Sequence, residues 1–477
     1  MVDVNKPPAA RTGAPGLQAG SVGLGAILMQ AITQISPTLG IFYTIAFTTG
    51  QAAGAAPLTY LVAFAVCLAL AVPLSGLARH LPSAGGFYTY VSRGLGPRAG
   101  FITGWLYAVM VAIVPASLAA FTGGVLHDAL APRFGIGLPW YVYALAIMAL
   151  CWFVAFRGIA LSMRLVVALG LFEIAVGLGL ALTGVLSPGP GGVNLAGFNP
   201  ATIPSSGGFF LAIVLSIFAF TGFESAATLA EESSNPARMV PRAIVGSLAL
   251  IGAFYVVCAW GLQIGWGTDN LPALASSSTA PAFVLADRVW GAGWLIILIA
   301  LVNSGIGVCI ACTTSATRTL YGMARSGALP GVLARVHPAR RTPHVAIAAQ
   351  TGLALAVLLA AGLPLGPFNL FNTLGVTGTY AYIVIFTLAN AAAWRYFRTQ
   401  ARAEFSPWSH AVLPLIATVA LAVIGWKSFD PMPDWPVRAG PLIAALYLAA
   451  GLALLAWNLR PRRRGWMASA GELPDIT

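Results

Sequence analysis

The chain has 477 residues, of which 58% are hydrophobic and 8% are charged, and its formal net charge is +12. A soluble protein carries about 25% charged residues, because its surface must be hydrated. This composition excludes an ordinary soluble enzyme, a disordered protein and a secreted disulfide scaffold. Since one transmembrane helix takes about 20 residues, a chain of this length suits about a dozen such helices.

Twelve apolar segments lie between a polar N-terminal tail, residues 1–20, and a C-terminal tail, residues 459–477. They cover residues 21–48, 56–78, 98–126, 138–156, 164–186, 208–231, 242–266, 291–322, 344–362, 369–393, 410–427 and 439–458. The first of them is too long for the core of a signal peptide, and we interpret it as a retained transmembrane helix. The sequence therefore predicts an all-α polytopic membrane protein with twelve transmembrane helices.

Basic residues gather on one side of this predicted bundle. With the N-terminus in the cytoplasm, all 25 Lys and Arg residues except Arg133, Arg288, Lys427 and Arg438 fall in cytoplasmic segments. This positive-inside asymmetry predicts a protein of the cell membrane with both termini in the cytoplasm. Because the charge is spread over many short loops, it favours orientation and contact with the lipid bilayer over nucleic-acid binding.

Two amphipathic connections suggest an internal repeat. Residues 84–96 follow the second helix on the inner side, and residues 280–291 follow the seventh helix on the outer side. An inverted repeat requires such opposite placement. The sequence predicts a five-plus-five inverted repeat, with helices 1–5 in 21–186, helices 6–10 in 208–393, and helices 11 and 12 in 410–458.

Helix-breaking chemistry occurs in the first helix of each predicted half. In helix 1, Pro37 removes a backbone donor and Gly40 relaxes the chain, and in helix 6 Gly222 follows a polar threonine. Transporters built on inverted repeats have broken helices at such matching positions. We therefore predict discontinuous helices 1 and 6. The alternative is an ordinary proline kink and an ordinary packing glycine.

A pair of broken helices suits an amino acid as ligand. A half-helix N-terminus exposes N–H groups that favour a carboxylate, and unwound carbonyl groups accept hydrogen bonds from an ammonium group. The predicted carboxylate site comprises Ser36, Pro37, Thr38, Leu39 and Gly40. The predicted amine site comprises the carbonyl groups of Phe218, Ala219 and Thr221, next to Gly222.

Glu173 and Glu224 are the acidic residues inside the predicted spans, apart from Glu231 at the inner end of helix 6. A charge in mid-membrane costs at least about 2.5–3.5 kcal/mol, so such groups face a cavity or a partner. Burial favours the protonated form of a carboxyl group, which makes both residues candidates for proton coupling. The alternative is a neutral, hydrogen-bonded acid that locks two helices together.

A cluster of charges marks the inner end of helix 6. Glu231 and Glu232 are predicted to pair with Arg79, Arg93 or the arginines of helix 8 as an inner gate. The alternative is a solvated loop whose ion pairs contribute little.

Other chemistry has little support in the sequence. The Cys309-x-x-Cys312 pair lies inside an apolar run, and the five histidines have no metal-ligand spacing, so we predict no metal site and no cofactor. No phosphate-binding loop and no hydrolase motif is present. We therefore predict that the chain is not an enzyme and that coupling to an ion gradient, or exchange, drives any transport.

Three stretches resemble the amino acid–polyamine–organocation superfamily of permeases. They are Arg79 to Trp105 (RHLPSAGGFYTYVSRGLGPRAGFITGW), Phe218 to Arg242 (FAFTGFESAATLAEESSNPARMVPR) and Thr317 to Pro330 (TRTLYGMARSGALP). The resemblance implies a twelve-helix inverted-repeat fold and uptake or exchange of amino acids or related amines, often driven by protons.

The resemblance also implies roles for particular residues. The broken part of helix 1, here Ser36 to Gly40, would bind the substrate carboxylate. Phe218 would gate the site, and Tyr107 would be the aromatic residue of helix 3 near it. Glu173 stands where some members carry a lysine linked to proton coupling. Helix 1 departs from the common Gly-x-Gly form.

We therefore expect a secondary transporter that moves amino acids or related amines by alternating access, with protons as the coupling ion. An exchanger and a polyamine importer are the alternatives, and a non-transporting nutrient sensor is a weaker one. Few carboxylates are available to bind a polyamine, which favours a zwitterion or a monoamine. No obligate protein partner is predicted.

Overall fold

The computed structural model describes residues 17–276, 281–427, 434–461 and 463–473. Within these residues the chain forms helices and connecting loops, and twelve segments are long and apolar enough to cross a membrane. The predicted all-α fold with twelve transmembrane helices is confirmed. Parts of the predictions lie outside the described residues: residues 1–16, 462 and 474–477 of the tails, residues 277–280 of the predicted unit 208–393, of which Ala280 belongs to the second amphipathic connection, and residues 428–433 of the predicted unit 410–458.

The helices follow the predicted segments closely, and several extend beyond them. Up to residue 186 they are α1 (Leu24–Ile35), α2 (Pro37–Phe42), α3 (Thr44–Ala52), η1 (Ala53–Ala55), α4 (Ala56–His80), α5 (Phe87–Leu95), α6 (Pro97–Phe134), α7 (Trp140–Arg157) and α8 (Ile159–Leu186). From there to residue 399 they are η2 (Ala196–Phe198), η3 (Pro200–Thr202), α9 (Ser206–Phe220), η4 (Phe223–Glu232), α10 (Pro236–Trp266), η5 (Thr268–Asn270), α11 (Leu271–Ala275), α12 (Pro281–Trp290), α13 (Trp294–Arg325), η6 (Gly331–Ala334), α14 (His344–Val357), η7 (Leu358–Gly362), α15 (Leu363–Leu365) and α16 (Pro367–Thr399). The remaining elements are η8 (Arg402–Glu404), η9 (Trp408–Val412), α17 (Leu413–Lys427), η10 (Val437–Ala439), α18 (Gly440–Asn458) and α19 (Trp466–Ser469).

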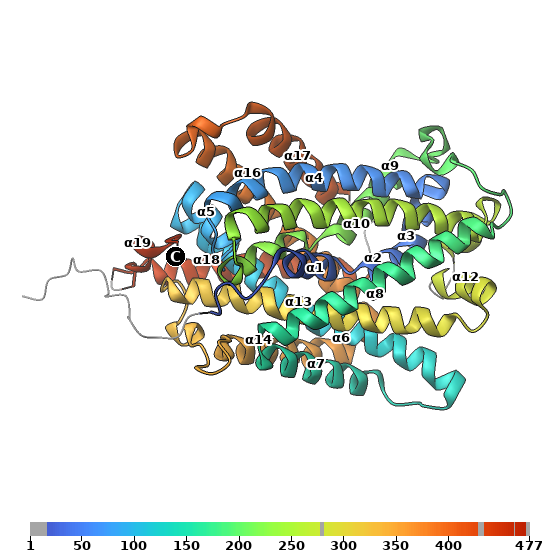
Figure 1. Ribbon diagram of the computed structural model, residues 1–477, viewed down its shortest axis with the longest axis horizontal. Helices are drawn as coiled ribbons and strands as arrows, with labels where there is room; N and C mark the ends of the chain where they lie inside the picture. Colours follow the sequence, from blue (N-terminus) through green and yellow to red (C-terminus); the bar gives the residue numbers. More distant parts are fainter. Residues whose placement is uncertain (1–16, 277–280, 428–433, 462, 474–477) are drawn as a thin grey trace, which may run out of the picture.

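The bundle has two distinct ends. α5 and α19 lie at the left end in Figure 1, and α12 lies at the right end. We call these ends the tail face and the far face. The two amphipathic connections therefore lie at opposite ends of the bundle, as an inverted repeat requires.

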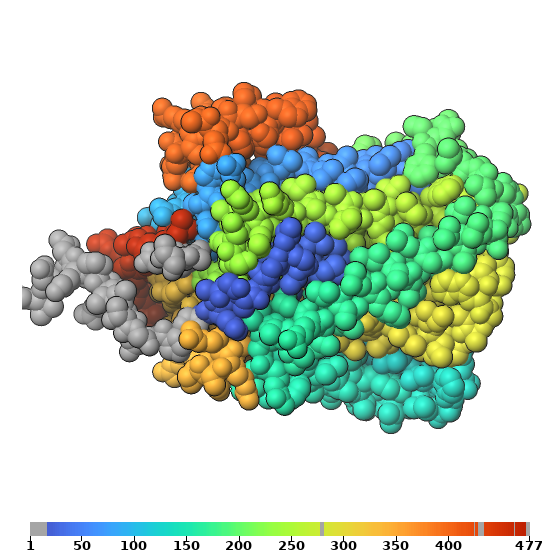
Figure 2. Space-filling view, viewed as in Figure 1, coloured from blue at the N-terminus to red at the C-terminus, as the bar shows by residue number. Residues whose placement is uncertain are grey.

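The outer helices expose apolar side chains. Leu415 and Val419 on α17, and Leu442 and Leu446 on α18, are each more than half exposed. Their spacing of four residues places each pair on one side of its helix. An exposed apolar stripe of this kind fits a hydrocarbon environment. In Figure 2 the orange part of the chain that leads into α17 projects from one side of the bundle.

Small residues allow the inner helices to pack closely. A side chain on Gly184 of α8 would lie 2.5 Å from the Gly261 carbonyl oxygen of α10, and one on Gly261 would lie 2.6 Å from the Ala181 carbonyl oxygen. Such small-residue contacts are common where membrane helices cross. α1 packs against both of these helices, and Figure 2 shows its blue surface enclosed between them.

Candidate functional site

The first helix is broken at Ser36. α1 ends at Ile35, Ser36 takes a left-handed conformation (φ 68°, ψ 73°), and α2 begins at Pro37. Proline suits the first position of a helix because it has no N–H group to leave unpaired there. The chain therefore presents the carbonyl end of α1 and the N–H end of α2 at one buried point, as the sequence predicts.

The sixth helix is broken at Thr221 and Gly222. α9 ends at Phe220, Gly222 has φ 128°, and the 3-10 helix η4 begins at Phe223. A side chain on Gly222 would lie 2.7 Å from the carbonyl carbon of Gln34 and the amide nitrogen of Ile35. The two breaks therefore touch, and only glycine fits between them.

A tyrosine that was not among the predicted site residues joins the two breaks. The hydroxyl of Tyr255, on α10, lies 3.3 Å from the carbonyl oxygens of Ile35 and Ser36 and 3.0 Å from that of Ala219. A side chain on Gly40 would collide with this hydroxyl. The glycine therefore makes room for a side chain that hydrogen-bonds the unwound ends of both helices.

Glu173 occupies the N-terminus of α2. Its Oε2 accepts hydrogen bonds from the Thr38 amide (3.2 Å), the Thr38 hydroxyl (3.1 Å) and the Ser304 hydroxyl (2.7 Å), and its Oε1 accepts one from Asn303 (3.3 Å). Ser304 also shares a 2.5 Å hydrogen bond with Ser36. The acid of α8 thus joins the broken helix to α13, at the point where the sequence predicts a substrate carboxylate.

Glu224 lies at the start of η4 and is fully enclosed. Its Oε2 accepts a hydrogen bond from the Gly222 amide (2.9 Å), and its Oε1 accepts one from the Tyr382 hydroxyl (2.9 Å). Tyr107, the predicted aromatic residue of helix 3, stands edge-on to Tyr382 with their ring centres 6.4 Å apart. Its own hydroxyl has no hydrogen-bond partner among the described residues.

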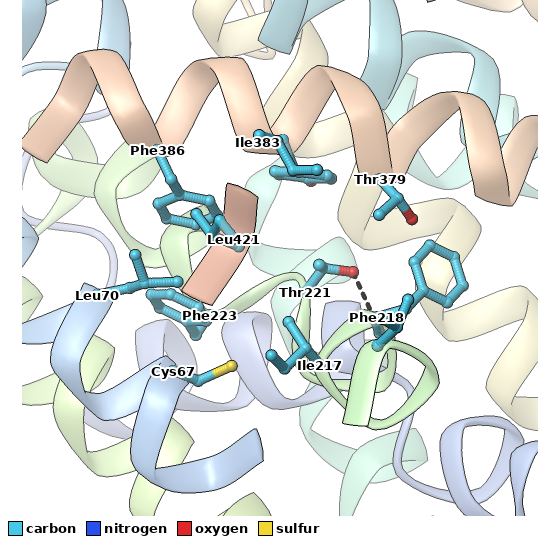
Figure 3. A pocket seen from close by; sticks show the side chains of 12 residues that line it. Cys67, Leu70, Ile217, Phe218, Thr221, Phe223, Thr379, Ile383, Phe386 and Leu421 are labelled. Carbon is cyan, nitrogen blue, oxygen red and sulfur yellow. Dashed lines mark hydrogen bonds between the residues drawn. The ribbon is translucent and has the colours of Figure 1, made fainter. Parts of the chain in front are cut away.

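The remaining predicted substrate residues lie around these two breaks. Pro37 and Leu39 are buried in α2. The Phe218 carbonyl accepts hydrogen bonds from the amide (3.2 Å) and the hydroxyl (2.9 Å, the dashed line in Figure 3) of Thr221, and the Ala219 carbonyl accepts the Tyr255 hydroxyl. The structure brings the predicted residues of helices 1, 3 and 6 together.

Sequence reasoning missed a polar cluster between the breaks and the tail face. The Gln34 side chain accepts a hydrogen bond from Ser315 (2.8 Å), and Gln30 donates one to the Ala311 carbonyl (2.9 Å). Thr228 of η4 lies 3.5 Å from the same serine. The signal in the sequence was two glutamines one turn apart on an apolar helix, a spacing that places both on one face.

Two ion pairs lie at the tail face beside η4, one fully buried and one with a partly exposed arginine. Glu232 accepts hydrogen bonds from the Nε (2.5 Å) and Nη2 (3.0 Å) of Arg318. Glu231 accepts from the Nη1 (2.6 Å) and Nη2 (2.7 Å) of Arg325, and also from the Ala84 amide (3.0 Å). Both arginines belong to α13, which is the predicted helix 8. The structure therefore pairs the two predicted acids with arginines of helix 8, in bidentate geometry.

Arg79 and Arg93 do not reach these acids, which corrects the predicted gate. Arg79 lies 3.6 Å from Glu404 in an exposed pair, and Arg93 donates to the Gly471 carbonyl (2.8 Å). A hydrogen bond from His80 holds the pKa of Glu404 below its usual range. Both arginines stand at the ends of α4 and α5, and α13 instead carries the arginines that face η4.

Replacing Glu232 with alanine is expected to destabilise the protein strongly. The side chains of Glu232 and Arg318 are 1% and 5% exposed, so the variant leaves a buried guanidinium without its partner, at a cost of about 3–5 kcal/mol. The thermal midpoint of the purified protein should fall by several degrees. The matched variant Glu404→Ala, in an exposed pair, should leave the midpoint unchanged. Equal midpoints for the two variants would show that the buried pair is not structural.

Among the described residues, twelve membrane-length helices with facing breaks in the first and the sixth define the class of the protein as a multi-pass membrane transporter. A sequence profile described as "Amino acid permease" matches residues 22–448. The chain therefore belongs to the amino acid permease family, within the superfamily that the sequence resembles, and it is a permease and not an enzyme.

Several curated proteins are similar to the chain over much of its length. The low-affinity putrescine importer PlaP of Escherichia coli (strain K12) is 26% identical, over 90% of this chain and 91% of its own. The branched-chain amino acid permease BcaP of Bacillus subtilis (strain 168) is 28% identical, over 68% and 70%. The glutamate/serine transporter AimA of the same strain is 27% identical, over 63% and 59%. These relatives are all transporters of small molecules.

Proposed function

We propose that this permease carries amino acids or related monoamines across the cytoplasmic membrane by alternating access, coupled to protons. The observation that carries the proposal is the contact between the two helix breaks, which brings the carbonyl groups of Ile35, Ser36 and Ala219 and a half-helix N-terminus to one buried point. Carbonyl oxygens suit an ammonium group, and a half-helix N-terminus suits a carboxylate. The relatives named for amino acids and for putrescine support an amino compound as the substrate.

The predicted site residues have roles in this proposal. The segment Ser36 to Gly40 binds the carboxylate, and the carbonyl groups of Phe218, Ala219 and Thr221 bind the amine beside Gly222. Phe218 and Tyr107 flank the site. In this proposal the two predicted repeats, residues 21–186 and 208–393, move relative to each other during transport. The predicted helices 11 and 12, residues 410–458, do not take part in that motion.

Glu173 supplies a physical link between substrate binding and protonation. The carboxyl group already accepts the Thr38 amide at the N-terminus of α2. A substrate carboxylate at the same half-helix would place two anions together, and two like charges at one site disfavour joint ionisation. Binding of the substrate therefore favours a protonated Glu173. Glu224 bonds the amide of the second break and can hold a proton in the same transport cycle.

The tail face is proposed to be the cytoplasmic face. The basic residues outside Arg133, Arg288, Lys427 and Arg438 support this orientation, because they would all lie on the inner side. The pairs Glu232–Arg318 and Glu231–Arg325 then form the inner gate, closed in this conformation. Opening the site to the cytoplasm requires these pairs to separate.

Ligand-induced stabilisation of the purified protein tests the substrate class. A ligand that binds only the folded state raises stability by RT ln(1 + [L]/Kd), so a substrate at 100 times its Kd adds about 2.7 kcal/mol. Amino acids and monoamines should raise the thermal midpoint, and hits should be taken up by proteoliposomes under an inward proton gradient. Uptake that needs internal substrate and ignores the gradient would identify an exchanger. No shift with any amino compound would overturn the proposal.

A further inference from the structure

One side of α18 is apolar along most of its length and stays exposed. Leu442, Leu446, Ala450, Ala453 and Trp457 are all exposed, and their spacing of three or four residues places them on one side of the helix. We call these five residues the α18 stripe. A stripe of exposed apolar residues that ends in a tryptophan is typical of a helix that faces lipid, with the indole ring at the level of the headgroups.

Two arginines cover this tryptophan from the turn that follows α18. The guanidinium carbon of Arg460 lies 3.9 Å from the centre of the Trp457 ring, and that of Arg463 lies 5.1 Å from it. The amides of Arg463 (2.8 Å) and Arg464 (3.1 Å) both donate to the Arg460 carbonyl, so the backbone gathers the three arginines in one turn. A guanidinium group stacked on a ring presents its N–H groups at the edge, where they can bind an oxyanion.

The charge of this turn is not neutralised within the part of the chain that the structure describes. The ion pairs there all involve basic residues of α4 and α13, and Arg460, Arg463 and Arg464 are exposed. Two guanidinium groups over one ring repel each other, and a phosphate group that accepts hydrogen bonds from both would relieve that repulsion. The turn therefore suits an anionic ligand.

The segment after the turn is docked on the tail face. Trp466 of α19 is 5% exposed, and its ring centre lies 5.6 Å from that of Phe101. The Ser469 hydroxyl donates to the carbonyl of Ser326, the residue that follows the gate arginine Arg325 (2.8 Å). Figure 1 shows α19 beside α5 at this end of the bundle. With α18 before it and this docked segment after it, the turn is held at the end of the α18 stripe.

We propose that Arg460, Arg463 and Arg464, together with the α18 stripe, bind an anionic phospholipid of the leaflet at the tail face. The phosphate group accepts hydrogen bonds from the guanidinium groups, and the acyl chains lie along the stripe. A headgroup without an ammonium group is preferred, because an ammonium group would be repelled by the arginines. A free phosphate ion or a nucleic acid would use the charges alone and leave the stripe uncovered. The inference does not depend on the substrate or the coupling ion of the proposed function.

A second stacked arginine at the tail face provides a matched control. The guanidinium carbon of Arg398 lies 4.9 Å from the ring centre of Trp394, near the end of α16, and Arg395 and Arg402 belong to the same stretch. Residues 381–390, which precede that tryptophan, are buried or half-buried, so no exposed apolar stripe leads to it. These three arginines therefore carry the same charge as the turn without a surface for acyl chains.

Native mass spectrometry of the delipidated protein tests the proposal. The protein is offered equal amounts of phosphatidylglycerol and phosphatidylcholine with the same acyl chains, and should retain phosphatidylglycerol in excess. Changing Arg460, Arg463 and Arg464 together to glutamine should lower the ratio of bound phosphatidylglycerol to phosphatidylcholine at least about tenfold, because each basic residue near an anionic lipid adds to its binding. Changing the same three residues to lysine should keep most of the preference, since the charge remains.

The control variant, with Arg395, Arg398 and Arg402 changed to glutamine, should leave the ratio unchanged. An equal fall in the control would show attraction to any basic surface and would overturn the site. The inference is also wrong if the unmodified protein retains both lipids equally, if the glutamine variant of the turn keeps the ratio, or if excess inorganic phosphate displaces the bound lipid. Should that triple variant not fold, Arg460→Gln alone replaces it and must lower the ratio at least about threefold.

Discussion

Glu224→Gln is expected to fold normally and to lose proton-driven accumulation of the substrate. The two carboxyl oxygens of Glu224 accept the Gly222 amide and the Tyr382 hydroxyl. A glutamine can keep both contacts, because its oxygen accepts from the amide and its nitrogen donates to the tyrosine, whose hydroxyl both donates and accepts. The substitution therefore removes the proton-binding group and keeps the local geometry.

Proteoliposomes with an inward pH gradient of one unit measure this effect. A carrier that moves one proton with each substrate molecule can accumulate the substrate up to about tenfold, since one pH unit corresponds to 1.36 kcal/mol. The variant should only equilibrate the substrate, with an unchanged thermal midpoint. Glu404→Gln, a change at an exposed acid, serves as the control and should accumulate like the unmodified protein. Full concentrative uptake by Glu224→Gln would remove Glu224 from the coupling mechanism.

Glu173→Gln is a less clean substitution. Its Oε1 accepts from the Asn303 side-chain nitrogen, and its Oε2 accepts from Thr38 and Ser304. A glutamine nitrogen in either place would face another donor. Loss of transport in that variant could come from lost proton coupling or from disturbed packing around residue 173. Glu224→Gln is therefore the sharper test of proton coupling.

Gly222→Ala is expected to abolish transport and to destabilise the fold. A methyl group there would lie 2.7 Å from the backbone of Gln34 and Ile35, and the backbone has φ 128°, where an L side chain is strained. The atoms in its way are main-chain atoms of α1, so they cannot rotate aside. Overpacking and backbone strain of this kind each cost about 1–3 kcal/mol.

Gly25→Ala is the matched control, because a side chain at that position of α1 meets nothing within 4 Å. The Gly25→Ala variant should insert into the membrane, fold and take up substrate like the unmodified protein. Gly222→Ala should show a lower thermal midpoint, no stabilisation by any ligand and uptake at background level. If both alanine variants behave alike, the contact between the two breaks is not essential.

Local chemistry made much of the architecture predictable. A run of about 20 apolar residues has few alternatives to a membrane helix, and Pro37 and Gly222 disturb their helices whatever surrounds them. The spans and both breaks therefore follow from short stretches of sequence. The position of Glu224 next to the second break follows from the same stretch, whereas the position of Glu173 at the first break depends on how α8 packs against α2.

Contacts between distant helices were not predictable in this way. Tyr255 is one aromatic residue among many on apolar helices, and only the packing of α10 against both breaks distinguishes it. The partners of the gate acids were equally hard to predict, because several arginines lie near the same predicted membrane face. Arg318 and Arg325 are seven residues apart, hence on one side of α13, and this spacing was the available signal that consecutive acids would meet both of them.

The Tyr255 hydroxyl has one hydrogen and three carbonyl oxygens within reach. The Ser36 carbonyl also accepts the Gly40 amide (2.8 Å), so the one hydrogen of the tyrosine is shared between the carbonyl groups of Ile35 and Ala219. A primary ammonium group has three hydrogens and could donate to both of them. Under the proposed function, the Tyr255 hydroxyl partly replaces the substrate ammonium group when no substrate is bound, because it hydrogen-bonds carbonyl groups of both broken helices. These carbonyl groups can accept further hydrogen bonds, which a bound ammonium group would donate.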